Sequence, residues 1–193
     1  MKLSQLVAAI GAAVAFSGAA NAAILTSTTG SSANVVTNYS TPALVAFDLD
    51  LQDFSSTRLD FVLEDGDLLG LFSMNALIRN LSGEGIKHFT FTLKGIAFSA
   101  PGSVTPTFGT VSQVHYDSDA AAIAFATPEF AEFHFGNPFS QNGKSNWFFN
   151  TTGLRAGDTF SITATVPEPS TIVLMLAALG MFGLFGAKRR NLR

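Results

Sequence analysis

Cysteine is missing from all 193 residues of the chain. This absence excludes disulfide bonds, thiolate zinc sites and iron–sulfur clusters, and it leaves no thiol nucleophile. Any folded domain must therefore be stabilised by packing alone. The residues between the two apolar ends of the chain are numerous enough to bury one hydrophobic core.

Basic residues are scarce in the middle of the chain. Between Ala23 and Val166 there are 6 Lys and Arg against 13 Asp and Glu, which gives a net charge near −7. An acidic surface disfavours nucleic acid, because contacts to phosphate need Lys and Arg. Cations and neutral polymers such as polysaccharide remain compatible with it.

Recognisable catalytic motifs are also missing. The sequence contains no Gly-x-Ser-x-Gly elbow, no His-Glu-x-x-His helix and no phosphate-binding glycine loop. We therefore predict that the protein is not an enzyme and has no cofactor. A secreted hydrolase is the least favoured alternative, since it would need two carboxylates about 5–10 Å apart across a cleft.

The first 22 residues have the pattern of a secretory signal peptide. Lys2 supplies a positive start, an apolar run follows, and Ala20-Asn21-Ala22 fits the small-x-small rule for cleavage. Cleavage after Ala22 makes Ala23 the first residue of the mature chain. The alternative is a transmembrane anchor, for which the apolar run is short.

Strict alternation of apolar and polar residues dominates the middle of the chain. It is clear at 47–51, 59–63, 89–93 and 160–166, and turn signals such as Asn142-Gly143 lie between such runs. We therefore predict an all-β domain over residues 23–165, an antiparallel β-sandwich or jelly roll.

Three features of this domain are less regular. The Ser- and Thr-rich segment 26–41 predicts a loose lead-in or an edge strand. Residues 68–78 could form a strand or a short helix. Gly95 interrupts an alternating run and predicts a bulge or a close backbone contact.

Phenylalanine is abundant, with 19 in the chain and 16 outside the apolar ends. At strand spacing, these rings predict core packing. Trp147-Phe148-Phe149 is different, because three consecutive aromatic residues cannot all face one core. Trp147 is therefore our candidate for stacking on a sugar ring, within the alternative hypothesis of a carbohydrate-binding module.

Two polar patterns could bind a metal ion. Glu132 and His134 lie on the same face of a predicted strand, and three Asp-x-Asp pairs supply carboxylates. These pairs are Asp48/Asp50, Asp65/Asp67 and Asp117/Asp119. We favour a polar outer strand face for the first pattern and a hairpin turn at Asp65-Gly66-Asp67, so we predict no metal site.

The C-terminal region has three parts in order. Pro167-Glu168-Pro169 is held extended, because each proline fixes its own φ and restricts the residue before it. Ile172–Ala187 is an uncharged apolar run, about 24 Å long as a helix and slightly short of a ~30 Å hydrocarbon core. Lys188, Arg189 and Arg190 then favour a cytoplasmic C-terminus.

Together these parts resemble the PEP-CTERM sorting signal over Val166–Arg193, with Glu168 as the central residue of the motif. The resemblance implies export, processing by the membrane enzyme exosortase, and a Gram-negative, exopolysaccharide-producing host. It implies an intermediate anchored in the inner membrane and then a cell-surface, extracellular or biofilm location. The alternative is an ordinary single-pass anchor after a proline-rich linker.

The sequence thus predicts three segments. They are a signal helix at 1–22, a β domain at 23–165, and a sorting signal at 166–193 that contains a transmembrane helix at 172–187 and a basic end at 188–193. The expected partners are the export machinery, exosortase, the membrane through the C-terminal helix, and exopolysaccharide.

Overall fold

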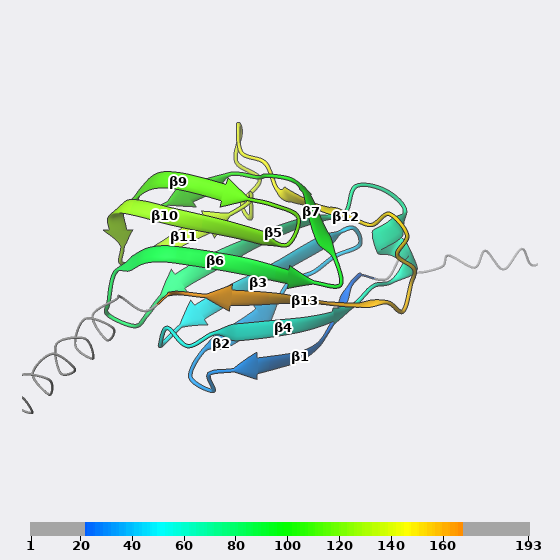
Figure 1. The fold of residues 1–193 in the computed structure, drawn as a ribbon, viewed down its shortest axis with the longest axis horizontal. Helices are drawn as coiled ribbons and strands as arrows, with labels where there is room; N and C mark the ends of the chain where they lie inside the picture. Colours follow the sequence, from blue (N-terminus) through cyan, green and yellow to red (C-terminus); the bar gives the residue numbers. More distant parts are fainter. Residues whose placement is uncertain (1–21, 168–193) are drawn as a thin grey trace, which may run out of the picture.

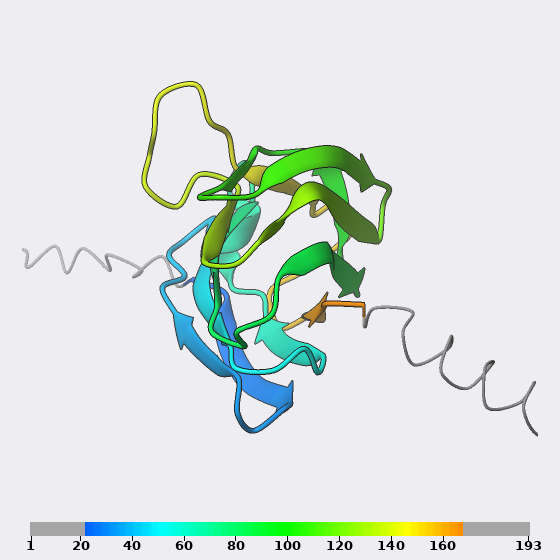
Figure 2. The same ribbon diagram turned by 90° about the vertical axis from the view of Figure 1, so that its left-hand side faces the viewer.

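The computed structural model describes residues 22–167. Within them, two β-sheets pack face to face around one core, as the side view and the end view show (Figures 1 and 2). The prediction of an all-β fold is confirmed. The four runs of strict alternation coincide with strands to within one residue, because period-two residues place one set of side chains in the core.

The first sheet has six strands, and every neighbouring pair is antiparallel. Its spatial order is β1 (Ile24–Gly30), β4 (Thr57–Val62), β13 (Thr159–Thr165), β6 (Ile86–Lys94), β10 (Ala120–Glu129) and β9 (Thr110–Tyr116). The last strand of the described chain, β13, is therefore central. It pairs with β4 on one side and β6 on the other.

The second sheet has seven strands. Its main order is β2 (Val35–Asn38), β3 (Leu44–Leu51), β5 (Ser73–Asn80), β11 (Glu132–Phe135) and β8 (Val104–Pro106). The short strand β12 (Trp147–Asn150) pairs with β5 and also with β7 (Ala97–Ala100).

One pair in the second sheet corrects the prediction of purely antiparallel sheets. Strands β3 and β5 are parallel over their full lengths. Parallel neighbours need a crossover connection, and here β4 in the opposite sheet and the 3₁₀ helix η1 (Asp65–Leu68) provide it. The six- and seven-stranded sheets also differ from the eight strands of a jelly roll.

The flanking helices predicted at 1–22 and 172–187 fall outside the described residues, except for Ala22. Within residues 22–167, no helix is long and apolar enough to cross a membrane.

Aromatic rings fill the space between the sheets, as the phenylalanine pattern predicts. The Phe91 ring lies edge-on to three others, those of Phe47, Phe89 and Phe135, with ring centroids 6.0, 4.8 and 4.8 Å away. These four side chains are at most 1% exposed. Burying large rings is the main stabilisation available to a chain without disulfides.

Gly95 lies where the chain leaves β6 in the first sheet and enters β7 in the second. Its φ is +84°, and a Cβ atom there would come within 2.6 Å of the Thr159 carbonyl oxygen. The prediction of a close backbone contact is confirmed, and its role is to form the corner between the sheets.

The remaining ambiguous segments are also assigned. Within 26–41, β1 and β2 are edge strands, one in each sheet. Segment 68–78 contains the end of η1 and most of β5. The hairpin turn predicted at Asp65-Gly66-Asp67 is wrong, because this segment forms η1 between strands of different sheets.

Candidate sorting signal and surface sites

Strand β13 leads the chain directly to its C-terminal motif. Val166 still packs in the core at 5% exposed, whereas Pro167 is exposed. Proline has no N–H group to donate to a strand ladder, so Pro167 is a natural stop for the pairing with β6. The motif thus begins at the last point where the domain holds the chain.

A shallow pocket of ≈ 390 Å³ adjoins this exit on the outer face of the first sheet. Pro167 forms one side of it. The other residues around it come from β6, β9 and β10: His88, Thr90, Gln113, His115 and residues 122–124. The Ala122 and Ala124 side chains are small, and they leave the sheet surface hollow between the two histidines.

The opposite end of the sandwich holds the predicted start of the mature chain (Figure 1). Ala23 is 2% exposed and belongs to the core, and Ala22 is half-buried. Ile24 pairs with Val62, which in turn pairs with Thr159 at the start of β13. The predicted cleavage site and the C-terminal motif are therefore separated by the length of the sheet. Ala20 lies outside the described residues.

Trp147 is not available to a glycan. It is 0% exposed, and its ring stacks on Phe135 with centroids 4.4 Å apart and an interplanar angle of 8°. The indole N–H donates to the Ser103 carbonyl at 3.4 Å. The prediction of a sugar contact at Trp147 is wrong, because Trp147 and Phe149 both point inward and Phe148 alone is left partly exposed.

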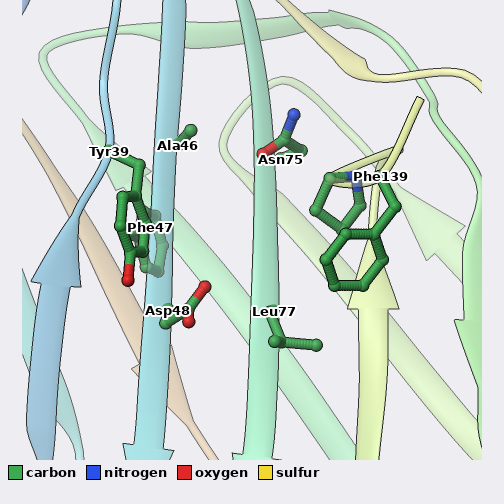
Figure 3. A pocket seen from close by; sticks show the side chains of 8 residues that line it. Tyr39, Ala46, Phe47, Asp48, Asn75, Leu77 and Phe139 are labelled. Atoms are coloured by element: carbon green, nitrogen blue, oxygen red, sulfur yellow. The ribbon is translucent and has the colours of Figure 1, made fainter.

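A different pair of rings does flank an open site, on the outer face of the second sheet. Tyr39 and Phe139 are 56% and 58% exposed, and between them lies a pocket of ≈ 300 Å³ (Figure 3). We call it the Tyr39–Phe139 groove. Strands β3 and β5 form its floor, through Ala46, Asp48, Asn75 and Leu77.

The polar and aromatic groups of this groove are held in place by neighbours. Phe139 lies edge-on to the His134 ring at 4.9 Å. Asp48 is paired with Arg79. The Asn75 amide N–H donates to the Asn146 side-chain oxygen at 3.2 Å. Aromatic walls over fixed polar floor groups suit a ligand with one apolar face and several hydroxyls.

The predicted polar pairs have structural roles. Asp48 and Asp50 both face Arg79, whose Nε lies 3.0 Å from the Asp50 carboxylate. Buried Asp67 accepts the N–H groups of Ala43 and Glu64. The turn at Asp117 is closed by the N–H groups of Asp119 and Ala120, which donate to the Asp117 carboxylate.

Glu132 and His134 share the outer face of β11, with 3.8 Å between His134 Nε2 and the carboxylate. Phe133 and Phe135 point into the core, as the polar outer-face interpretation expects. Among residues 22–167, no cluster of three or more His, Asp or Glu side chains could hold a metal ion.

Glu129 is a buried carboxylate that sequence reasoning missed. It is 0% exposed at the end of β10, and it accepts N–H groups from Phe108, Gly109 and Ala131 at 2.8–2.9 Å. Burial raises the pKa of this carboxyl group, but the backbone donors outweigh burial and bring its pKa below the usual value. In the sequence, nothing around Glu129-Phe130 indicates that this carboxylate is buried.

Comparison with known proteins decides the nature of the C-terminal region. A family model described as the PEP-CTERM protein-sorting motif matches residues 165–190. The chain carries a PEP-CTERM sorting signal. The match begins at Thr165, the last residue of β13, so the PEP-CTERM signal starts where the folded domain ends. No curated protein and no solved structure matches the chain.

The PEP-CTERM signal implies an exported protein with a membrane-associated intermediate and exosortase as the processing partner. Of the sorting-motif residues, Pro167 is described, and it is exposed at the exit from β13. Glu168, Pro169 and the basic residues Lys188, Arg189 and Arg190 lie outside the described residues.

Proposed function

We propose that this is a non-enzymatic protein of the cell surface or extracellular matrix of a Gram-negative, biofilm-forming bacterium. It is exported through its signal peptide, held in the inner membrane by its C-terminal helix, and released or transferred by exosortase. The PEP-CTERM match at residues 165–190 carries this proposal.

Two features of the domain support a non-catalytic role. The acidic pairs are committed to structure, since Asp48 and Asp50 neutralise Arg79, and Glu129 closes a backbone turn. The sheets enclose a tightly packed aromatic core. Such a domain suits display outside the cell, where packing has to replace disulfides.

The test is to express the full chain in paired strains that contain or lack an exosortase. Intact mass and surface release are then measured. We expect a shortened C-terminus and release in the first strain alone, and we expect Glu168→Ala to abolish both. Glu84→Ala, at an exposed turn of the domain, is the matched control. Equal masses and equal release in the two strains would contradict processing.

We further propose that the Tyr39–Phe139 groove binds a neutral saccharide of the surrounding polymer. Exposed rings can stack on the apolar face of a sugar, the Asp48 carboxylate can accept hydrogen bonds from its hydroxyl groups, and the Asn75 amide N–H can donate to its oxygens. The net charge near −7 of the region favours neutral over acidic polymers. This replaces Trp147 as the site of the carbohydrate-binding hypothesis.

Pull-down on neutral exopolysaccharide tests this second proposal. Tyr39→Ala and Phe139→Ala should each weaken retention about fivefold or more, on the scale of one lost stacking contact. Phe108→Ala removes a ring that is even more exposed but does not line the groove, and it should leave retention unchanged. If all three variants are retained like the natural chain, the groove is not the binding site.

A further inference from the structure

Three large apolar side chains are exposed at the end of the sandwich where the chain leaves β13. Phe108 is 74% exposed, Phe130 58% and Leu81 50%. We call these residues the exit tip. They come from three separate connections, after β8, β10 and β5. Isolated exposed apolar residues are common, but three around one point at the site of exit need a reason.

Strand register places the exit tip beside the C-terminal motif. Ile86 at the start of β6 pairs with Glu129 at the end of β10, and Thr90 pairs with Thr165. The start of β6 and the last residues of β10 and β13 therefore lie together, at the end of the sandwich toward which the β13 arrow points (Figure 1). Phe130 follows Glu129 in the sequence, and the Phe108 N–H donates to the Glu129 carboxylate, so both residues lie next to Glu129.

The exit tip is rigidly mounted. The Glu129 carboxylate accepts the N–H groups of Phe108, Gly109 and Ala131. The Asn80 side chain donates to the Glu129 carbonyl at 3.0 Å, which ties the connection that carries Leu81 to the same point. These hydrogen bonds fix the connections that carry the exposed apolar side chains.

The length of the chain beyond the domain limits how far this tip can be from a bilayer. Five residues separate Val166, which is packed in the core, from Ile172, the first residue of the predicted transmembrane helix. Six Cα steps span at most about 22 Å when fully extended. While the tail is in the membrane, this end of the domain must therefore stay near the lipid surface.

We propose that, in the anchored intermediate, the exit tip contacts the lipid bilayer, with Phe108, Phe130 and Leu81 lying in its interfacial region. The inference rests on the proposed membrane-held stage. Phenylalanine and leucine partition into this region, and the tether removes most of the cost of bringing them there. Contact at this end would hold the domain upright over its own cleavage site.

Charge does not provide the driving force. The turn before β6 carries Glu84 and the end of β10 carries buried Glu129, against Lys87 at the start of β6, so these groups give the tip no excess of positive charge. The contact should therefore form on zwitterionic lipid and be insensitive to salt. The opposite end of the sandwich also exposes apolar side chains, Leu69 at 83% and Leu71 at 78%, and these face away from the membrane in this orientation.

The absence of cysteine allows a direct test in the full chain. Phe108→Cys and Leu69→Cys each replace an exposed apolar residue at opposite ends, and each can carry the only environment-sensitive label. The two proteins are reconstituted through their tails into phosphatidylcholine vesicles. Quenching by a lipid-attached quencher is compared with quenching by aqueous iodide, and emission of buried Trp147 checks that each variant is folded.

We expect the label at residue 108 to be quenched several-fold more by the lipid quencher than the label at residue 69, with the reverse order for iodide. Equal quenching of both labels, with the protein still resistant to alkaline extraction, would overturn the membrane contact while leaving anchoring intact. Extraction of the whole chain by alkali would instead contradict the anchored stage itself.

Discussion

Gly95 and Gly153 share a φ of +84° but differ in their surroundings. At Gly153 a Cβ would meet nothing within 4 Å, whereas at Gly95 it would lie 2.6 Å from the Thr159 carbonyl oxygen. Gly153→Ala should lower the free energy of unfolding by about 1–2 kcal/mol, the cost of a left-handed backbone.

Gly95→Ala should cost more than Gly153→Ala by at least about 1 kcal/mol, because the corner between the sheets must also move. Urea unfolding followed by the emission of Trp147, the single tryptophan, measures both variants. Equal losses would mean that the close approach at Gly95 relaxes without strain.

Glu129 should make stability depend on pH. Its pKa is depressed in the folded protein, so the stability it contributes is complete above its usual value of 4.5 and is lost as the pH falls through the folded value. Glu129→Gln should lower the free energy of unfolding by roughly 1–3 kcal/mol at pH 7, because one acceptor oxygen facing backbone N–H groups becomes a donor.

The difference between natural chain and Glu129→Gln should then shrink once the pH falls below 4.5. Glu132→Gln, on the outer face of β11, is the control and should show little loss at either pH. A loss that stays constant across this range would mean that the ionised carboxylate is not what Glu129 contributes.

Short-range residue signals were open to more than one interpretation. Asn38, Asn80 and Asn150 match the glycosylation sequon, and each ends a strand where its side-chain oxygen accepts the N–H of the residue two positions later. Asn-x-Ser/Thr therefore marks a turn in this protein. Trp147 was misassigned for a related reason, since alternation shows that neighbouring rings face opposite ways but not which face is buried.

At the scale of elements, ion pairs on the outer face of the second sheet link the parallel strands β3 and β5. Arg79 on β5 pairs with Asp48 and Asp50 on β3. Because the Arg79 side chain is 37% exposed, Arg79→Met should cost less than about 1 kcal/mol at low salt. The loss should decrease further at 1 M salt, where both attraction and carboxylate repulsion are screened.

Urea midpoints at the two salt concentrations check this, with Arg58→Met as the comparison, since Arg58 pairs with Asp60 alone. A loss for Arg79→Met that is unchanged by salt would point to packing of the Arg79 side chain and not to its charge.

Strands were predictable where one face is buried and the other is wet, as in β3, β4, β6 and β13. Their partners were not, because pairing depends on contacts far apart in sequence. The parallel register of β3 and β5 depends on a crossover through the other sheet, and no local pattern records it. The Tyr39–Phe139 groove was missed for the same reason, since its walls meet across strands.

At the scale of the whole molecule, the connections differ in how exposed they are. Lys144 and Arg155 lie in exposed loops on either side of β12, whereas Arg79, Lys87 and Lys94 lie in strands. Brief trypsin treatment of the folded protein should therefore cut first within these two loops. Fragments cut at Lys144 should co-elute in native chromatography, because β11 and β12 both pair with β5. First cuts at residues 79–94 would contradict this fold.

The same global view separates what the C-terminal pattern could and could not predict. Proline spacing, an apolar run and basic residues are contiguous in sequence, and they identified the PEP-CTERM signal without any structure. The exit tip required strand register, because Leu81, Phe108 and Phe130 are distant in sequence.

The two ends of the described chain lie at opposite ends of the sandwich, with Ala23 at one and Val166 at the other (Figure 1). Every molecule attached through its C-terminal side therefore has the same orientation, with the Ala23 end of the sandwich away from the point of attachment. An antibody, a phage or a neighbouring cell approaching from outside would first meet the loops around Leu69 and Leu71. A tag joined ahead of Ala22 would be displayed at that outermost level.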